Sequence, residues 1–219
     1  MKSIFLLLGI SIAFSQHSIS QNSGYPEPEF SNEVYSYRKD SANKLLRLEK
    51  GYSKMNTKTK LGGMAGAENS YSIDGERSTS RLNSGTNLSF VFSTGVEQGK
   101  KTSPQTDSIM KAHGVDPAMM SMMQDGMMDP YKMITLYQVD AEKSERKIYL
   151  MKTGGALPFA SKKNKSSDKY SFSVKKIRDG YWELIIDKTL PKGEYAFTVM
   201  GMGAANMDGT TSIFAFAID

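Results

Sequence analysis

The chain has no cysteine and only two histidines, His17 and His113. The lack of cysteine excludes a disulfide framework, a zinc–thiolate site, a cysteine nucleophile and a lipid-modified N-terminal cysteine. Two histidines so far apart exclude a zinc site of the His-Glu-x-x-His type, and a Ser-His-Asp triad would have to use His113. A Gly-x-Ser-x-Gly motif is also missing. We therefore predict that the protein is not an enzyme; a hydrolase built on an unmarked pair of carboxylates is the alternative.

Long apolar runs are missing from the rest of the chain once the N-terminus is passed. Lys2 precedes a short apolar stretch, residues 4–14, and small residues at Ala13 and Ser15 suit cleavage by a signal peptidase. The stretch is well below the roughly 20 residues that span a bilayer. We predict a signal peptide over residues 1–15, a secreted or periplasmic protein, and no transmembrane segment after cleavage.

A strong charge bias is missing as well. The formal net charge is +5, and the basic residues are dispersed along the chain. The densest group, Lys162, Lys163, Lys165 and Lys169, sits among serine and asparagine and is typical of a solvated loop. A nucleic-acid surface would need a basic stripe with interleaved aromatic residues. We therefore expect no nucleic-acid partner.

What the chain does contain is alternation of apolar and polar residues with a period of two, strongest in the last quarter. Residues 170–174, 182–186 and 195–199 alternate, and turn residues separate them. The last run, 213–218, is apolar at every position, which predicts a strand covered on both faces. The C-terminal quarter thus predicts four strands.

Shorter strand signals fill the earlier part of the chain. We predict strands at residues 33–37, 45–48, 71–73, 77–82, 88–92, 133–139 and 146–151. Residues 52–61 fit either a strand or a loop, and 16–31 form an extended lead-in with Pro26 and Pro28. The spacing predicts a mainly β fold, an antiparallel β-sandwich in one domain over residues 32–219.

A methionine-rich block interrupts these strands. Eight of the 15 methionines lie between Met110 and Met133. Asp107 fits the start of a short helix ending at Gly114, and Asp116-Pro117 fits the start of a second one ending near Gly126. We therefore predict a helical Met-rich insertion over residues 107–128.

Three roles remain open for this block. Methionine packs irregular apolar contacts, so the block can pack on the sandwich or present an adaptable surface to a partner. The residues expected at such a partner contact are Met119, Met120, Met122, Met123, Met127 and Met128. Clustered thioethers also favour Cu(I), so the alternative is a periplasmic copper site. Its expected ligands are Met119, Met120, Met122, Met123 and His113; no other cofactor is predicted.

Several loose motifs, taken together, resemble a family of secreted bacterial proteins with no established function. They are Glu33-Val-Tyr-Ser-Tyr37, Lys60-Leu-Gly-Gly-Met64, Asp129-Pro130 before Leu136-Tyr137, Gly193-Glu-Tyr-Ala-Phe197 and the closing Phe214-Ala-Phe-Ala-Ile-Asp219. The resemblance implies a β-sandwich and export, and it implies no catalytic residues. The block between Gly99 and Met128 departs from the family pattern.

The spacing Leu190-x-x-Gly193-x-Tyr195 resembles the tyrosine corner of immunoglobulin-like domains, in which a tyrosine hydroxyl bonds back to the chain. This resemblance implies that Tyr195 is structural and that Trp182 is a core residue. The alternative for these aromatic residues is a platform for a sugar. The sequence as a whole predicts an exported, non-catalytic binding or structural module of the bacterial cell envelope. Its expected partner is an unknown envelope or extracellular protein.

Overall fold

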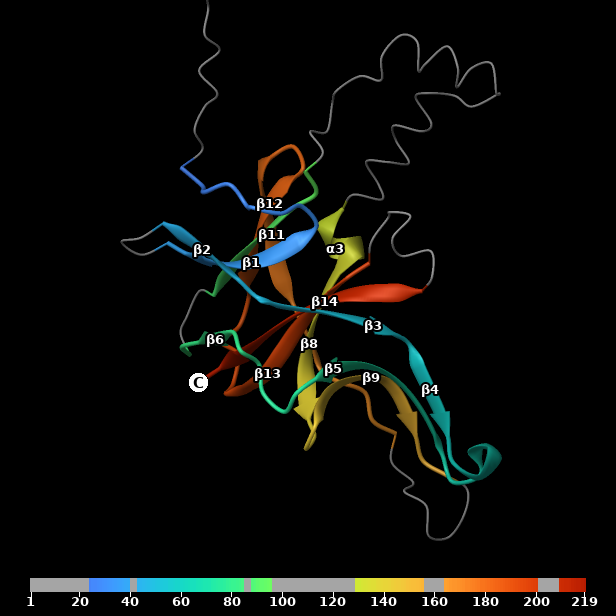
Figure 1. Ribbon diagram of the computed structural model, residues 1–219. Helices are drawn as coiled ribbons and strands as arrows, with labels where there is room; N and C mark the ends of the chain where they lie inside the picture. The colour runs from blue at the N-terminus through green and yellow to red at the C-terminus, as the bar shows by residue number, and fades with distance from the viewer. Residues whose placement is uncertain (1–23, 40–42, 85–87, 96–128, 156–163, 201–208) are drawn as a thin grey trace, which may run out of the picture.

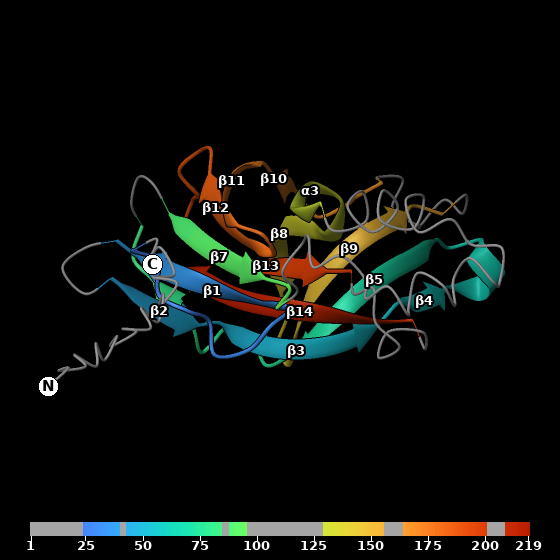
Figure 2. The same ribbon diagram turned by 90° about the horizontal axis from the view of Figure 1, so that it is seen from above.

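The computed structural model describes residues 24–39, 43–84, 88–95, 129–155, 164–200 and 209–219. In these residues the chain is mainly β, and two antiparallel sheets pack in a sandwich-like arrangement (Figures 1 and 2). The predicted fold class is therefore confirmed at this level. No helix in these ranges is both long and apolar enough for a membrane span.

The first sheet has five strands, and every neighbouring pair is antiparallel. Its order is β11 (Phe172–Arg178), β12 (Tyr181–Ile186), β7 (Ser89–Ser93), β1 (Glu33–Arg38) and β2 (Lys44–Arg47). Side chains alternate between the two faces of a strand. One face of this sheet therefore carries phenylalanine and leucine toward the second sheet, and the other carries tyrosine and carboxylate side chains.

The second sheet has nine strands. Its main path runs through β3 (Glu49–Lys54), β14 (Thr210–Ile218), β13 (Gly193–Val199), β8 (Ile134–Ala141), β9 (Glu145–Thr153), β5 (Ala67–Asp74) and β4 (Asn56–Thr59). Two short strands lie off this path: β10 (Lys169–Tyr170) pairs with β8, and β6 (Arg81–Leu82) runs parallel to β14.

The nine-stranded sheet curls, because its two edge strands are consecutive in the chain. Only Met55 separates β3, at one edge, from β4, at the other. The backbone N–H of Ser72 on β5 donates to the hydroxyl of Ser53 on β3 at 3.0 Å, which ties the edge strand β3 to β5, the neighbour of β4. The turn after β4 contains the short 3-10 helix η1 (Leu61–Gly63). Figure 1 shows β3 continuing into β4, with the ends of β4, β5 and β9 extending away from the five-stranded sheet.

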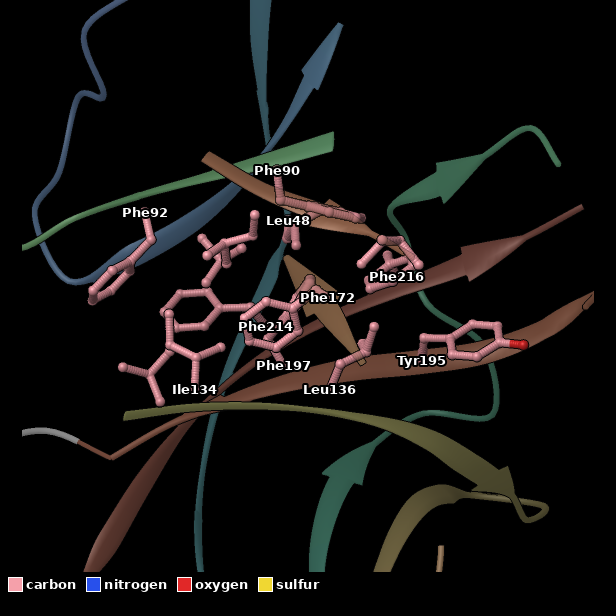
Figure 3. Close-up of a cluster of buried hydrophobic side chains, with 14 of the residues drawn as sticks. Leu48, Phe90, Phe92, Ile134, Leu136, Phe172, Tyr195, Phe197, Phe214 and Phe216 are labelled. Carbon is pink, nitrogen blue, oxygen red and sulfur yellow. The ribbon is translucent and has the colours of Figure 1, made fainter. Parts of the chain in front are cut away.

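The main core lies between the two sheets and is rich in aromatic rings (Figure 3). Phe90 of β7 packs against Phe197 of β13 and Phe216 of β14, with ring centroids 4.8 and 5.1 Å apart. Aromatic pairs at such separations stabilise by about 0.5–1.5 kcal/mol beyond the burial of their area. These contacts fix how the two sheets face one another.

A second core fills the opposite face of the nine-stranded sheet. It contains Ile73, Tyr137, Val139, Ile148, Ala196, Ile213 and Ala215. In β14, Phe214 and Phe216 lie in the main core, whereas Ile213 and Ala215 lie in the second. The prediction of a last strand covered on both faces is confirmed, and β14 joins the two cores.

Two strand predictions need correction. Residues 170–174 were predicted as one strand, but β10 pairs with β8 and β11 pairs with β12, so the chain changes sheet at Ser171. Residues 77–82 were predicted as a strand, and only Arg81–Leu82 pair. The preceding residues instead form a loop whose backbone N–H groups at Ser78 and Thr79 donate to carboxylates.

One short helix, α3 (Pro130–Met133), leads into β8. The side chain of Asp129 accepts a hydrogen bond from the backbone N–H of Tyr131 at 3.0 Å, and proline occupies the first turn. A capping aspartate followed by proline is a typical helix start. The helix lasts a single turn because Ile134 already has an extended backbone and starts β8.

Candidate functional site

The predicted Met-rich insertion, residues 107–128, lies outside the described residues. This applies to every residue predicted there as a partner contact or a copper ligand: His113, Met119, Met120, Met122, Met123, Met127 and Met128. The two aromatic residues predicted to be structural are described. Trp182 is buried and stacks on Phe92, with centroids 6.1 Å apart. Tyr195 is fully buried, and its hydroxyl donates to the carbonyl of Pro191 at 2.8 Å.

The most site-like arrangement among the described residues is the outer face of the five-stranded sheet. Because Val34, Phe90, Phe92 and Trp182 point into the main core, the alternate residues of the same strands point outward. These outward residues are Tyr35, Tyr37, Val91 and Tyr181, and all four are buried. We call this surface the tyrosine face.

A segment of the same chain covers the tyrosine face. Residues 24–31, which we call the strap, precede β1 and cross the sheet without forming a strand of it. Figure 1 shows the strap in dark blue, passing beside β12 before the chain turns back into β1. The turn is sharp: Asn32 has φ 58°, and its N–H donates to the carbonyl of Ser93 at 2.6 Å. Asparagine tolerates this left-handed conformation better than most residues.

Side chains of the sheet hold the backbone of the strap. The hydroxyl of Tyr181 donates to the carbonyl of Pro26 at 2.6 Å, and the side-chain amide of Asn43 donates to the carbonyl of Gly24 at 2.6 Å. Farther along, the backbone N–H of Phe30 donates to the hydroxyl oxygen of Tyr35 at 3.1 Å. These bonds reach main-chain atoms, so they recognise an extended backbone more than particular side chains.

Tyr25 of the strap packs among the side chains of the tyrosine face. Its ring packs on Tyr37 and against the edge of Tyr181, at centroid distances of 5.2 and 6.5 Å. Its hydroxyl donates to Oε2 of Glu183 at 2.6 Å, and Lys175 Nζ lies 3.2 Å from the same hydroxyl. Burial, followed by the bond to Glu183, raises the pKa of Tyr25 to about 12. The tyrosine therefore stays protonated and acts as a hydrogen-bond donor.

Glu183 is a fully buried carboxylate on β12, with no exposed surface. Besides Tyr25, it accepts the hydroxyl of Ser89 at 2.5 Å and pairs with Lys39 Nζ at 2.5 Å. Burial acts to raise the pKa of this carboxyl, but the bonds from Lys39, Ser89 and Tyr25 together hold it below its usual range. Without Tyr25, Glu183 would keep Lys39 and Ser89 but lose one of its three partners.

A second buried carboxylate, Glu33 on β1, lies at the other side of the face. Arg47 makes two bonds to it, both of 2.9 Å, and Lys50 makes one of 2.8 Å. Burial favours the neutral form, yet these cations hold the pKa of Glu33 below its usual value. A glycoside hydrolase needs one carboxyl with a raised pKa to act as general acid. Glu33 and Glu183 both have lowered values, so they are suited to fixed charge and not to proton transfer.

An ion pair and a cation–π contact also join the strap to the sheet. Glu27 pairs with Arg178 of β11, and the guanidinium of Arg47 lies over the ring of Phe30, 4.5 Å from its centroid. The strap therefore offers aromatic, proline and acidic residues in alternation, and the sheet offers tyrosine hydroxyls and basic side chains. From the sequence alone these residues are expected to form only an extended lead-in, and this site is not predicted. The available signal was Tyr25-Pro-Glu-Pro-Glu-Phe30, an aromatic and acidic pattern that a plain linker does not need.

In the part of the chain that the structure describes, no three histidine, aspartate or glutamate side chains gather so as to hold a metal ion. Comparison with protein-family models finds no match, and neither curated proteins nor solved structures show one. The site must therefore be interpreted from its own geometry.

Proposed function

We propose that this protein is an exported, non-catalytic binding or structural module of the bacterial cell envelope. The observation that supports this proposal is the strap on the tyrosine face. A sheet whose side chains hydrogen-bond to the main chain of an extended segment has the chemistry of a peptide-recognition surface. The lowered pKa values of Glu33 and Glu183 favour binding over acid–base catalysis.

The remaining parts of the proposal rest on the sequence. Export rests on the predicted signal peptide, residues 1–15. The Met-rich insertion over residues 107–128 stays a prediction as a second contact surface, and the copper site stays an alternative to it. The immunoglobulin-like character of the sandwich also stays a prediction, and the bond from Tyr195 to Pro191 supports it.

Site-directed photocrosslinking in the native envelope tests the proposal. A photoreactive residue replaces Lys175, which lies on β11 beside Tyr25 at the tyrosine face. A matched protein carries it at Leu61, whose side chain is 66% exposed in η1. We expect a discrete crosslinked protein with the probe at position 175 and not at position 61. If neither the probe at position 175 nor a third probe in the insertion, at Gln124, gives a crosslinked partner that is absent with the probe at position 61, the binding function is refuted.

A further inference from the structure

We propose that the tyrosine face is a binding site for an acidic, proline-containing extended segment of another protein, and that the strap occupies this site in cis. The inference rests on the proposed binding function and names the chemistry of its ligand. The strap alone could be a structural cover. We assign to the tyrosine face, in addition, the capacity to select a peptide.

The bonds to the strap are those that a separate peptide would make. The strap does not add a strand to the sheet, and its main chain is held by Tyr181, Asn43 and Tyr35. Proline at positions 26 and 28 restricts the backbone and carries no N–H that would need a partner on the sheet. Tyrosine-lined grooves bind proline-rich segments in this way, because the segment is already extended before it binds.

Three positions define what the face selects. An aromatic residue with a hydroxyl fits between Tyr37 and Tyr181, where it donates to Glu183. Two residues later, an acidic side chain reaches Arg178. A second aromatic ring, that of Phe30 in the strap, lies beneath Arg47. Together with proline, which restricts the backbone of the segment, these three positions give the pattern tyrosine, proline, acid, and a second aromatic residue three positions after the acid.

Charge on the face matches this ligand. Lys39, Lys175, Arg178 and Arg47 surround the strap, which itself carries Glu27 and Glu29. Opposite charges across an interface steer association and suppress wrong partners. A basic or neutral peptide would leave Arg178 without its acidic partner, whereas Lys39 and Arg47 already pair with Glu183 and Glu33 of the sheet. An acidic segment is thus the partner that the surface favours.

Exchange of the strap for a partner is possible because one of the contacts that hold the strap is weak. The ion pair between Glu27 and Arg178 is solvent-exposed, with side chains 66% and 42% accessible. Exposed pairs of this kind contribute little to stability. The tether to β1 at Asn32 adds to the bonds that hold the strap, since a short linker gives an effective concentration on the order of millimolar. A partner segment must compete with this intramolecular copy.

The test measures binding of a labelled peptide to the full mature protein. The probe is fluorescein-Gly-Tyr-Pro-Glu-Pro-Glu-Phe-Ser, the sequence of residues 24–31, and the readout is fluorescence anisotropy. The wild type is compared with Glu27→Gln and with the double variant Tyr25→Ala/Glu27→Gln, whose straps are progressively weaker. We expect affinity to rise in that order, at least tenfold from the wild type to the double variant. A scrambled peptide of the same composition is expected to bind at least tenfold more weakly.

Two further variants locate the peptide on the face. Tyr181→Phe, added to the double variant, removes the donor to the main-chain carbonyl, and we expect a loss of five- to tenfold in affinity. Tyr52→Phe, on β3 of the other sheet and 63% exposed, is the matched control and should change nothing. Circular dichroism and a cooperative urea transition establish that each variant is folded. If the double variant does not fold, Tyr25→Phe, which removes the hydroxyl that donates to Glu183, is compared with the wild type instead.

Three results would overturn the inference. The first is no increase in peptide affinity in a folded variant with a weakened strap. The second is equal binding of the scrambled peptide. The third is a concentration-dependent dimer in which the strap of one copy crosslinks to Lys175 of another, because the site would then serve a second copy of this chain. None of these results bears on a crosslink found in the envelope, so failure here leaves the proposed binding function to its own test.

Discussion

Replacing Arg146 by methionine tests whether a buried cation holds one end of the nine-stranded sheet together. Arg146 lies on β9 with a side chain only 1% exposed. Its guanidinium donates to the backbone carbonyls of Gly75 and Asp74, at 3.0 and 2.9 Å. It also pairs with Glu49 of β3, through both carboxylate oxygens, and lies 3.6 Å from Glu194 of β13. One side chain thus joins β3, β9, β13 and the loop after β5.

The expected loss of stability follows from the carboxylates that lose their partner when methionine replaces Arg146. Glu49 and Glu194 have side chains only 20% and 12% exposed, so both would lose the guanidinium in a largely desolvated place. Removing one partner of a buried ion pair costs roughly 3–5 kcal/mol. We therefore expect Arg146→Met to lower the free energy of unfolding by about 4 kcal/mol at pH 7, the middle of that range.

Arg81→Met is the matched control. Arg81 also approaches Glu194, at 4.0 Å, and pairs with Asp219, but its side chain is 43% exposed. Water screens such pairs, so we expect a loss well below that of Arg146→Met. Urea unfolding followed by the fluorescence of Trp182, the single tryptophan, measures both variants.

The pH dependence of the free energy of unfolding tests the same contact in a second way. Burial acts to raise the pKa of Glu49, but bonds from Arg146, Ser78 and Thr79 hold it below its usual value. Such a carboxylate contributes stability above its unfolded-state pKa, about 4.3, and that contribution is lost as the pH falls through the lower folded-state pKa. The difference between wild type and Arg146→Met should therefore be smaller at pH 3 than at pH 7. A loss under about 1 kcal/mol at pH 7, or an equal loss at both pH values, would refute the reasoning, because a buried pair is expected to cost more.

Three further variants probe other parts of the fold by urea unfolding. Leu136→Ala, at a fully buried position of the main core, should cost about 2–5 kcal/mol, whereas Leu61→Ala, 66% exposed, should stay within about 0.5 kcal/mol; similar costs would contradict the assigned core. Gly155→Ala should destabilise the ends of β5 and β9, because the added Cβ would lie 2.5 Å from Cα of Ala65, and faster hydrogen exchange there would report it; unchanged exchange would argue against this close approach. Tyr195→Phe, which removes the bond of its hydroxyl to the chain, should cost about 0.5–1.5 kcal/mol; no measurable cost would mean that this bond does not stabilise the corner.

Most strands could be predicted because alternation reports burial of one face directly. Trp182, Leu184 and Ile186 alternate with other residues because they enter the main core, and the apolar run 213–218 reflects two cores. The change of sheet at Ser171 was not predictable in this way. The alternation of Tyr170, Phe172 and Val174 continues through it, since all three side chains reach the same core from two different sheets.

No pattern in the sequence predicts the closure of the nine-stranded sheet. Every residue of β4 is exposed, so its strand character comes from backbone pairing with β5 and from no buried side chain. The tyrosine face was missed for a related reason. Its partners are far apart in the chain, as in the pair of Tyr25 and Glu183, and nothing local indicates that the two meet.

The composition of the tyrosine face explains why a cover is needed at all. An outer sheet face in water normally carries polar side chains, which need no cover. Here Tyr35, Tyr37 and Tyr181 would expose large apolar rings, and Glu183 would lose one of the partners that keep its charge stable. The strap meets both needs, yet it does so through side-chain bonds and without the continuous ladder of a strand. A cover held in this way stabilises the sheet while it is bound and leaves a selective surface when it is displaced, so the same residues account for the stability of this face and for its proposed use in binding.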